Sequence, residues 1–220
     1  MKAMILAAGR GERMRPLTDT TPKPLLKIGK HCLIEHHIFN LKAAGFTDLV
    51  INTAWLAEKI HQQLGDGSQY GVNITYSDEK SALETGGGIK KALSLFADEN
   101  FLVVNGDIWC EYDFSKLPTL DNNRLAHLIL VNNPEHNLNG DFAIEDKLLS
   151  NSTQNRLTFS GIGIYRAELF NQPDERFALA PVLRKAAEKK QISAEYFNGL
   201  WVDIGTPERL QELNNSIGNE

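Results

Sequence analysis

A stretch near the start of the chain, Met4–Leu26, combines glycines with several cations. Its apolar first residues end at the turn Gly9–Gly11, and threonines and prolines follow. A glycine loop after a strand lets backbone N–H groups approach a polyphosphate, while cations supply the opposite charge. The stretch therefore predicts a phosphate-binding site, and its cations are Arg10, Arg13, Arg15 and Lys23.

This loop differs from two common nucleotide-binding motifs. The sixth position of a dinucleotide-binding GxGxxG would be Met14, and the chain contains no GxxxxGK[ST] P-loop. Prolines at positions 16, 22 and 24 are expected to keep residues 10–25 extended, with no helix directly after the glycines. Such a loop can wrap over a triphosphate and bring Arg13 and Lys23 to it from two directions. The alternative is a solvated basic turn with structural glycines.

Two aspartates follow apolar runs that we expect to be strands. Asp107 comes after Phe101–Val104, and Asp203 comes after Trp201-Val202. Aspartates at strand ends are frequent Mg²⁺ ligands, and Mg²⁺ usually takes one or two protein carboxylates together with phosphate oxygens. We therefore predict that Asp107 and Asp203 bind Mg²⁺. The alternative is that each aspartate only caps a loop.

A run of three glycines, Gly86–Gly88, follows Glu84-Thr85 where a helix is expected to begin. Bare backbone permits close approach of a flat base or a sugar, with N–H donors for carbonyl oxygens. A uracil base also needs an acceptor for its N3–H, which Glu79 or a nearby carbonyl could supply. The alternative is a flexible turn.

Other catalytic chemistries have no support. The six histidines have no metal-binding spacing, and no GxSxG signature of a hydrolase occurs. We interpret His36 and His37 as helix-surface or helix-packing residues. Cys32 and Cys110 form no CxxC pattern, which indicates free buried thiols in a reducing compartment.

In the first half of the chain, strand patterns alternate with helix patterns, and these elements must position the candidate residues. Because parallel strands end at one edge of a sheet, we expect Gly9–Arg15, Asn52-Thr53, Ser77–Glu79 and Gly106-Asp107 to meet there. The predicted strands are Lys2–Ala8, Leu49–Ile51, Val72–Tyr76 and Phe101–Val104. The predicted helices are Leu33–Ala44 with Gly45 as its cap, Trp55–Leu64 and Ile89–Phe96.

The second half predicts antiparallel or mixed pairing. Its patterns are a strand Leu125–Val131, a hairpin Asp141–Leu149 that turns at Glu145–Lys147, a strand Thr158–Tyr165, a helix Leu179–Lys190, short strands Glu195–Phe197 and Trp201-Val202, and a last helix Pro207–Leu213 capped by Thr206. The fold class is therefore α/β, with a doubly wound, mostly parallel mixed sheet flanked by helices.

Composition bounds the class of protein. A chain of 220 residues, 42% of them hydrophobic, suits one globular domain over residues 1–220. The formal net charge of -5 argues against a nucleic-acid partner. The apolar run before Gly9 is too short for a signal peptide core or a membrane span, so we predict a cytoplasmic protein without a membrane partner.

The segment LAAGRGERMRPLTDTTPKPLLKIGKHCLIEHHI resembles the loop of sugar-phosphate nucleotidyltransferases, and LETGGGI, VVNGDIW and WVDIGTPERL follow in the family's order. The resemblance covers essentially the whole chain. It implies a Rossmann-like, GT-A-like fold without the C-terminal β-helix of longer members. The combination of LETGGG, VNGD and LTFSGI is most similar to the branch that uridylylates N-acetylmuramate α-1-phosphate in cell-wall recycling. That branch implies Mg²⁺-dependent transfer of UMP from UTP to the sugar 1-phosphate, with release of pyrophosphate.

The resemblance also implies roles for single residues. Arg13 and Lys23 would contact the reacting phosphates, and Asp107 and Asp203 would bind Mg²⁺. Residues 1–115 would form the nucleotide-binding half and residues 116–220 the sugar-phosphate half. Nucleotide contacts would come from Leu6, Ala7, Ala8, Gly9, Gly11, Glu79, Gly86, Gly87 and Asn105, and sugar-phosphate contacts from Gly140, Ser160 and Gly161.

One departure from the family leaves open which residue holds the phosphate of the acceptor sugar. Many relatives have a Glu-Lys-Pro run whose lysine holds the sugar phosphate, whereas residues 151–157 here read NSTQNRL. Arg156, Arg15 and Lys27 are the candidates to replace that lysine.

Alternative functions also stay open. In the same class they are mannose-1-phosphate guanylyl transfer and glucose-1-phosphate uridylyl or thymidylyl transfer. In another class, the chain would be a non-catalytic nucleotide-sugar-binding regulatory subunit. Without the extra β-helix, a monomer is expected rather than an oligomer.

Overall fold

The computed structural model describes residues 1–97 and 100–217. The chain divides into two compact units. The first unit contains Lys2–Ala82, Asn105–Leu117 and the chain from Leu200 onward. The second unit contains Leu83–Val104 and Pro118–Gly199.

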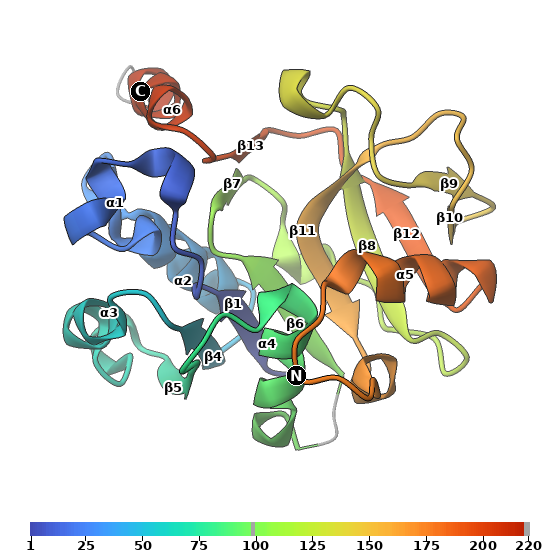
Figure 1. The fold of residues 1–220 in the computed structure, drawn as a ribbon, viewed down its shortest axis with the longest axis horizontal. Helices are drawn as coiled ribbons and strands as arrows, with labels where there is room; N and C mark the ends of the chain where they lie inside the picture. Colours follow the sequence, from blue (N-terminus) through green and yellow to red (C-terminus); the bar gives the residue numbers. More distant parts are fainter. Residues whose placement is uncertain (98–99, 218–220) are drawn as a thin grey trace. The chain divides into compact units, whose positions relative to one another are not determined.

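Three parallel strands form the sheet of the first unit, in the order β5-β4-β1 (Figure 1). They are β1 (Ala3–Leu6), β4 (Asp48–Thr53) and β5 (Asn73–Asp78). Five consecutive residues of β4 are buried, as expected for a strand that is covered on both faces. Because all three strands run the same way, their C-terminal residues lie at one edge, and the predicted strand positions are confirmed.

Helices α2 (Leu33–Ala43) and α3 (Ala57–Leu64) connect these strands. The N-terminus of α2 has a capping box in which Glu35 accepts a hydrogen bond from the Cys32 N–H at 2.6 Å. Gly45 follows α2 with a φ of 90°, which confirms it as the residue that ends the helix. Helix α3 begins two residues later than predicted, since Leu56 adopts a φ of 51°.

The first unit also contains short strands and the helix α6. The strands are β2 (Lys27–Ile28), β3 (His31–Cys32), β7 (Ile108–Cys110) and β13 (Trp201–Asp203), and α6 spans Pro207–Ile217. The Thr206 hydroxyl accepts a hydrogen bond from the Arg209 N–H at 3.5 Å, which confirms the predicted cap of α6. Strands β2, β3 and β7 were not predicted, because two or three residues are too few to show a strand period.

The prediction that residues 10–25 are extended is wrong. The segment contains two 3₁₀ turns, Glu12–Met14 and Lys23–Leu25, and a single-turn helix α1 (Leu17–Thr20). The prolines allow this because Pro16 and Pro22 precede helical turns and Pro24 lies in the first turn of one. A missing N–H costs nothing in those places.

The second unit has six strands in the order β6-β11-β8-β12-β10-β9. Strands β8 and β12 pair in parallel, whereas the other neighbours are antiparallel, as predicted for this half. The hairpin turn between β9 and β10 is also confirmed, with Asp146 and Lys147 both at positive φ. The strands are β6 (Phe101–Asn105), β8 (Ala126–Val131), β9 (Ala143–Glu145), β10 (Leu148–Ser150), β11 (Thr158–Tyr165) and β12 (Ile192–Tyr196).

Two helices belong to the second unit, α4 (Glu84–Ala92) and α5 (Leu179–Glu188). The predicted opening of a helix at the glycine run is confirmed, with the glycines inside its first turns, whereas α4 ends at Ala92 and a 3₁₀ turn, Leu93–Leu95, takes the place of its predicted last residues. The fold class, a mostly parallel mixed sheet flanked by helices, is the one that the sequence predicts. The described residues contain no β-helix. Of the helices in residues 1–97 and 100–217, none has the length and apolar character needed to cross a bilayer.

Candidate active site

The glycine loop of the first unit folds back on itself. Gly11 has a φ of 64°, and its carbonyl accepts a hydrogen bond from the Thr18 hydroxyl at 2.7 Å. A side chain at Gly11 would also meet Thr18 and Lys23, at 2.9 and 3.3 Å. Glycine is therefore required there by both backbone conformation and space. Thr18 was not among the predicted site residues, because a threonine in a loop carries no distinctive signal.

A buried methionine anchors this loop. Met14 is fully buried in a cluster that also contains Leu26, Ile204 and two leucines of α6. Burial of one such side chain contributes about 1.5–3 kcal/mol to stability. The first loop and the segment around Asp203 are thus parts of one apolar core within the first unit.

Lys23 and Asp107 form an ion pair. The Lys23 Nζ donates to Asp107 Oδ2 at 2.8 Å, and the exposed fractions of the two side chains are 8% and 43%. The buried ammonium thus faces a carboxylate that is open to solvent on its other side. The structure therefore brings together two residues that the sequence placed in the same site.

Gly106 sets the position of Asp107. Its N–H donates to the Leu6 carbonyl at 2.9 Å, and a Cβ there would lie only 2.5 Å from that oxygen. Any larger residue would push the Asp107 segment away from the end of β1. This glycine is required by a close backbone approach rather than by its φ angle.

Asp203 lies on a strand adjacent to the Asp107 segment. Strands β7 and β13 are antiparallel, with Asp203 opposite Ile108, and the Ile204 N–H donates to the Asp107 carbonyl at 2.8 Å. The Asp203 carboxylate contacts the guanidinium of Arg209, from the first turn of α6. Arg209 was not predicted, although its place in the segment TPER, just after the aspartate, would have been a signal for it.

Binding of Mg²⁺ by the two aspartates stays a prediction. Asp203 ends β13 and Asp107 directly precedes the neighbouring strand β7, and the part of the chain that the structure describes has no group of three or more His, Cys, Asp or Glu residues able to hold a metal. A cation there would need ligands from outside the protein. Mg²⁺ is such a cation, because it usually combines one or two carboxylates with substrate phosphates and water.

Arg13 differs from Lys23 in its surroundings. It is exposed, and no ion pair or hydrogen bond of its side chain occurs within the described residues. The neighbouring Arg10 lies over the Trp55 ring at 5.9 Å, and Arg15 pairs with Asp19 at 3.2 Å. Among the loop arginines, Arg13 is therefore the one whose guanidinium is left available for a ligand.

A polar network joins the C-terminal ends of the three parallel strands. The Ala7 N–H donates to Asn52 Oδ1 at 2.9 Å, and Asn52 Nδ2 donates to Glu79 Oε1 at 2.7 Å. Glu79 is 8% exposed, and its N–H donates to the Thr53 carbonyl at 2.7 Å. The predicted meeting of these segments at one edge is confirmed. Asn52 fixes the orientation of the Glu79 carboxylate, for which the sequence predicts a contact with the nucleotide base.

His37 is a buried packing residue, in agreement with its interpretation from the sequence. It is 4% exposed, and burial lowers its pKa from 6.5 to about 4, against the opposing effect of Asp107. The ring is therefore neutral at pH 7. His36 contacts the Ile28 carbonyl at 3.0 Å on the flank of α2.

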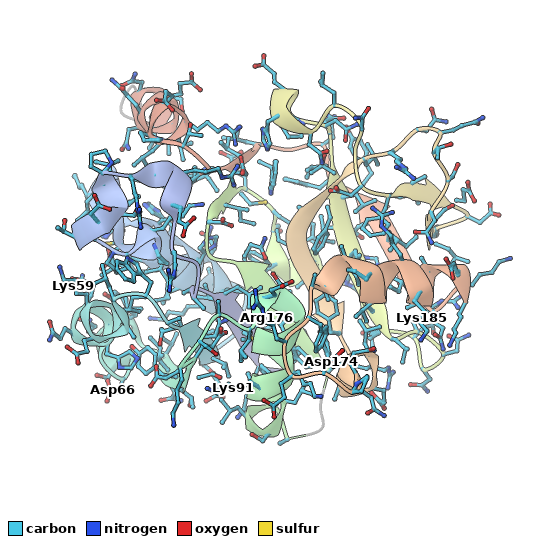
Figure 2. All side chains as sticks on the ribbon, in the orientation of Figure 1. Lys59, Asp66, Lys91, Asp174, Arg176 and Lys185 are labelled. Carbon is cyan, nitrogen blue, oxygen red and sulfur yellow. The ribbon has the colours of Figure 1, made fainter. Side chains whose placement is uncertain are left out.

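Gly86 and Gly87 pack against their own unit. A Cβ at Gly86 would lie 2.3 Å from the Phe177 ring, and one at Gly87 would lie 2.3 Å from the Glu175 carbonyl. The Gly87 N–H donates to the Phe177 carbonyl at 3.1 Å. Arg176, labelled in Figure 2, pairs with Glu84 at 3.5 Å in the same segment. The structure thus explains these glycines by helix packing, and their contact with a nucleotide stays a prediction.

The predicted sugar-binding residues lie on two irregular segments of the second unit. Gly140 has a φ of 59° and packs against Asn133 and Arg156. Ser160 and Gly161 form a bulge where the register between β11 and β8 shifts. The Ser160 hydroxyl donates to the Ile129 carbonyl at 2.7 Å, so it stabilises the bulge itself. Bulges are frequent beside active sites, where they redirect a strand.

The chain is similar in sequence to known proteins over most of its length. The family model described as "Nucleotidyl transferase" matches residues 2–140. The chain is 52% identical to an N-acetylmuramate alpha-1-phosphate uridylyltransferase of Neisseria meningitidis serogroup B, over 99% of both chains. It is 33% identical to a protein of the same name from Caulobacter vibrioides, with 94% of this chain and 92% of the relative covered.

A solved structure supports the fold. HddC from Yersinia pseudotuberculosis, complexed with GMP-PN, has a TM-score of 0.81 and 21% sequence identity, with 98% of this chain and 99% of that chain covered. At this identity the likeness supports the fold alone. It agrees with the mostly parallel mixed sheet described above.

Proposed function

Because the chain belongs to the nucleotidyl transferase family, we propose that it transfers UMP from UTP to N-acetylmuramate α-1-phosphate and releases pyrophosphate. The observation that carries this proposal is the 52% identity with the Neisseria relative over 99% of both chains. An alignment that covers both chains end to end leaves no further domain of the relative to supply the activity. The geometry of the first unit suits the same chemistry.

The proposed reaction needs no general base. A sugar 1-phosphate is largely dianionic at pH 7, since its second pKa is about 6. One of its oxygens attacks the α-phosphorus of UTP and forms a new P–O bond. The bond from that phosphorus to the β-phosphate oxygen breaks, and pyrophosphate leaves with the electron pair. The step therefore requires no histidine or serine as a general base or as a nucleophile.

Positioning and charge stabilisation are then the main tasks of the protein. We assign Lys23 to the reacting phosphates, because its ammonium is buried and held at one end by Asp107. We assign Arg13 to the β- and γ-phosphates and the departing pyrophosphate, because its guanidinium is exposed and free of protein partners in the described chain. Growing negative charge on the leaving group would be countered by both cations.

Asp107 and Asp203 are the residues that would hold Mg²⁺. When bound, the ion would neutralise phosphate charge and help to align the triphosphate. The Lys23 and Arg209 contacts orient both carboxylates without it. We propose that these cations share the aspartates with the metal ion rather than block it.

The remaining contacts are also proposals. The edge formed by Ala7, Asn52 and Glu79 suits a base, because it presents an oriented carboxylate beside backbone amides. The full proposed nucleotide set is Leu6, Ala7, Ala8, Gly9, Gly11, Glu79, Gly86, Gly87 and Asn105, and the sugar-phosphate set is Gly140, Ser160 and Gly161. We further propose that the reaction serves cell-wall recycling in the cytoplasm, since N-acetylmuramate is a cell-wall sugar. The monomeric state and the halves 1–115 and 116–220 stay predictions.

A substrate grid tests the proposed function. Pyrophosphate release is measured with UTP, GTP, dTTP and ATP against the 1-phosphates of N-acetylmuramate, N-acetylglucosamine, glucose and mannose, each with and without Mg²⁺. We expect the highest kcat/KM for UTP with N-acetylmuramate α-1-phosphate, and none after chelation. Preference for GTP with mannose 1-phosphate would replace the proposed substrates. Calorimetric binding of UDP-sugar without turnover of any pair would favour the regulatory subunit.

A further inference from the structure

Asn52 makes two hydrogen bonds that fix which way its amide points. Its Oδ1 accepts from the Ala7 N–H at 2.9 Å, and its Nδ2 donates to Glu79 Oε1 at 2.7 Å. A backbone N–H only donates, and carboxylate oxygens only accept. The reverse orientation of the amide would therefore break both bonds. Because Asn52 is only 4% exposed, water would not replace them.

The position of Asn52 in the sheet allows it to reach both partners. Strand β4 lies between β1 and β5, and the register pairs Asn52 with Leu6 on one side and with Ser77 on the other (Figure 1). The two outer strands are separated by two strand spacings, about 9–10 Å. A side chain at the end of the central strand can therefore bond to the glycine loop after β1 and to the segment after β5.

The backbone of Glu79 is held in place as well. Its N–H donates to the Thr53 carbonyl at 2.7 Å, and the Thr53 hydroxyl donates to the carboxylate of the preceding residue, Asp78. Asp78 also pairs with His61 of α3 at 3.0 Å. The main chain at position 79 is thus fixed, and the bond to Asn52 decides how the side chain there is turned.

Nucleobases differ in the polarity of the edge that a protein can read. Uracil and guanine carry an imino N–H, which needs an acceptor, whereas cytosine and adenine carry a ring nitrogen that is itself an acceptor. A site with the wrong polarity rejects a base, because a buried donor or acceptor is then left unpaired. A carboxylate has about four acceptor positions, so Glu79 can accept from Asn52 and also from an imino N–H.

We propose that Asn52 and Glu79 act as a pair that selects nucleobases with an imino N–H. This inference rests on the assignment of Glu79 to the base in the proposed function. Asn52 donates to one carboxylate oxygen and so turns the carboxylate to offer an acceptor to the base. The residue type at position 79 does not decide the selection alone, because Asn52 would turn an amide there so that it offers a donor. Asn52 is a positioning residue, since it acts through Glu79.

The test exchanges the two side chains. In Glu79→Gln, Asn52 Nδ2 still donates, so the oxygen of the introduced glutamine has to face Asn52 and its N–H₂ is offered to the base. The ratio of the affinity for UTP to the affinity for CTP should then fall roughly 10- to 100-fold, as expected for the loss of one charge-assisted bond.

The exchanged double variant, Asn52→Asp with Glu79→Gln, should reverse this loss. The introduced aspartate accepts from the Ala7 N–H and from the glutamine N–H₂, so the glutamine oxygen is offered to the base. The affinity ratio should return to within about fivefold of the wild type, because a neutral acceptor binds an N–H somewhat less strongly than a carboxylate. The exchange keeps the formal charge and nearly the volume of the pair.

Dissociation constants are measured by calorimetry for UTP, CTP, GTP and ATP, with Mg²⁺ and without an acceptor sugar. Pyrophosphate release with N-acetylmuramate α-1-phosphate is measured separately, and thermal melting checks that each variant folds. If the exchanged variant does not fold, Asn52→Ala with Glu79→Gln removes the donor instead. The glutamine can then turn either way, and the UTP to CTP ratio should lie above that of Glu79→Gln.

A matched control is provided by the other end of the same two strands. Asn73 Nδ2 donates to Asp48 Oδ1 at 3.1 Å, and the two residues are partners in the register of β4 and β5. The double variant Asp48→Asn with Asn73→Asp makes the same chemical exchange at the N-terminal edge, where both side chains are exposed. It should bind all of the nucleotides like the wild type.

The outcomes are distinct. A UTP to CTP ratio within twofold of the wild type in Glu79→Gln, or a ratio that stays as low in the folded exchanged variant, overturns the proposed pair. A wild type that binds none of the nucleotides also overturns it. A wild type that prefers GTP contradicts the proposed substrate, but the GTP to ATP ratio should then fall and recover in the same variants. Binding of UTP without pyrophosphate release contradicts the proposed reaction and leaves the pair standing.

Discussion

Replacement of Lys23 by methionine should abolish most of the activity but lower the stability of the protein only slightly. The substitution keeps the length of the side chain and removes the ammonium that lies 2.8 Å from Asp107 Oδ2. Loss of a cation that stabilises transition-state charge costs about 3–4 kcal/mol by analogy with oxyanion-hole donors, a factor of about 10²–10³ in kcat.

The stability cost follows from the burial of the two partners. At an effective dielectric constant of about 20, two charges 2.8 Å apart attract by about 6 kcal/mol, most of which offsets the desolvation of the lysine. In Lys23→Met, the remaining Asp107 side chain is 43% exposed and stays hydrated, so we expect a net loss on the order of 1 kcal/mol. Even a protein of about 5 kcal/mol stability would then be only about 0.1% unfolded.

The opposite substitution gives a contrast. Asp107→Asn leaves an ammonium whose side chain is only 8% exposed without its counter-charge. The cost of an unpaired buried charge is larger, about 3 kcal/mol or more. The melting temperature should therefore fall further in Asp107→Asn than in Lys23→Met, although both variants lose activity.

The assay is pyrophosphate release under saturating substrates, with thermal melting of the same samples. Lys42→Met, an exposed lysine of α2 in the same unit, is the matched control and should retain wild-type turnover. A folded Lys23→Met protein with kcat within threefold of the wild type would refute the assignment. An equal or smaller melting shift for Asp107→Asn would refute the argument from burial.

Three further predictions concern other parts of the first unit. Arg13→Ala should lower kcat/KM about 10²-fold or more with an unchanged melting temperature, because this exposed guanidinium has no partner within the described chain; activity near the wild type would contradict it. Gly106→Ala should destabilise the protein by about 1–3 kcal/mol in urea melts, since its Cβ would lie 2.5 Å from a backbone oxygen, whereas Gly9→Ala, with nothing within 4 Å, should not. Burial lowers the pKa of His37 from 6.5 to about 4. As the pH falls below about 6.5, His37 is therefore protonated in the unfolded chain before it is protonated in the folded protein, and the free energy of unfolding decreases until about pH 4. That decline, about 3 kcal/mol, should shrink in His37→Leu but not in the exposed His136→Gln; equal slopes in chemical melts would disprove it.

The strands and their shared edge could be predicted from sequence because their signal is local. Strand β4 contains the predicted apolar run Leu49–Ile51, although it extends from Asp48 to Thr53. Each parallel strand must end at the same edge, which brought Asn52 and Glu79 together. Lys23 and Asp107 were each assigned to the site from a local feature, a cation in the glycine-loop segment and an aspartate at the end of a strand. The ion pair between them joins residues 84 positions apart in sequence.

Other features depend on contacts that local pattern does not record. Residues 10–25 were expected to be extended, yet Met14 is drawn into a core with α6 and the chain forms short helical turns around it. The glycines of α4 were explained by an approaching ligand, but Phe177 and Glu175, about ninety residues later, occupy the space beside them. The sequence shows that glycine stands at such positions, but it does not show which neighbouring group occupies the space beside it.

The glycine loop, the two aspartates and the cations of the loop could be identified from the sequence alone, because residue type and spacing fix which chemistry is available. Tertiary structure alone decided which of those charges are already paired and which are not. Lys23 is buried against Asp107, Arg209 contacts Asp203, and Arg156 and Arg184 donate to backbone carbonyls, those of Asn151 and Asp141. Burial and pairing are properties of distance in the folded chain, and they decide which charges remain available for a substrate.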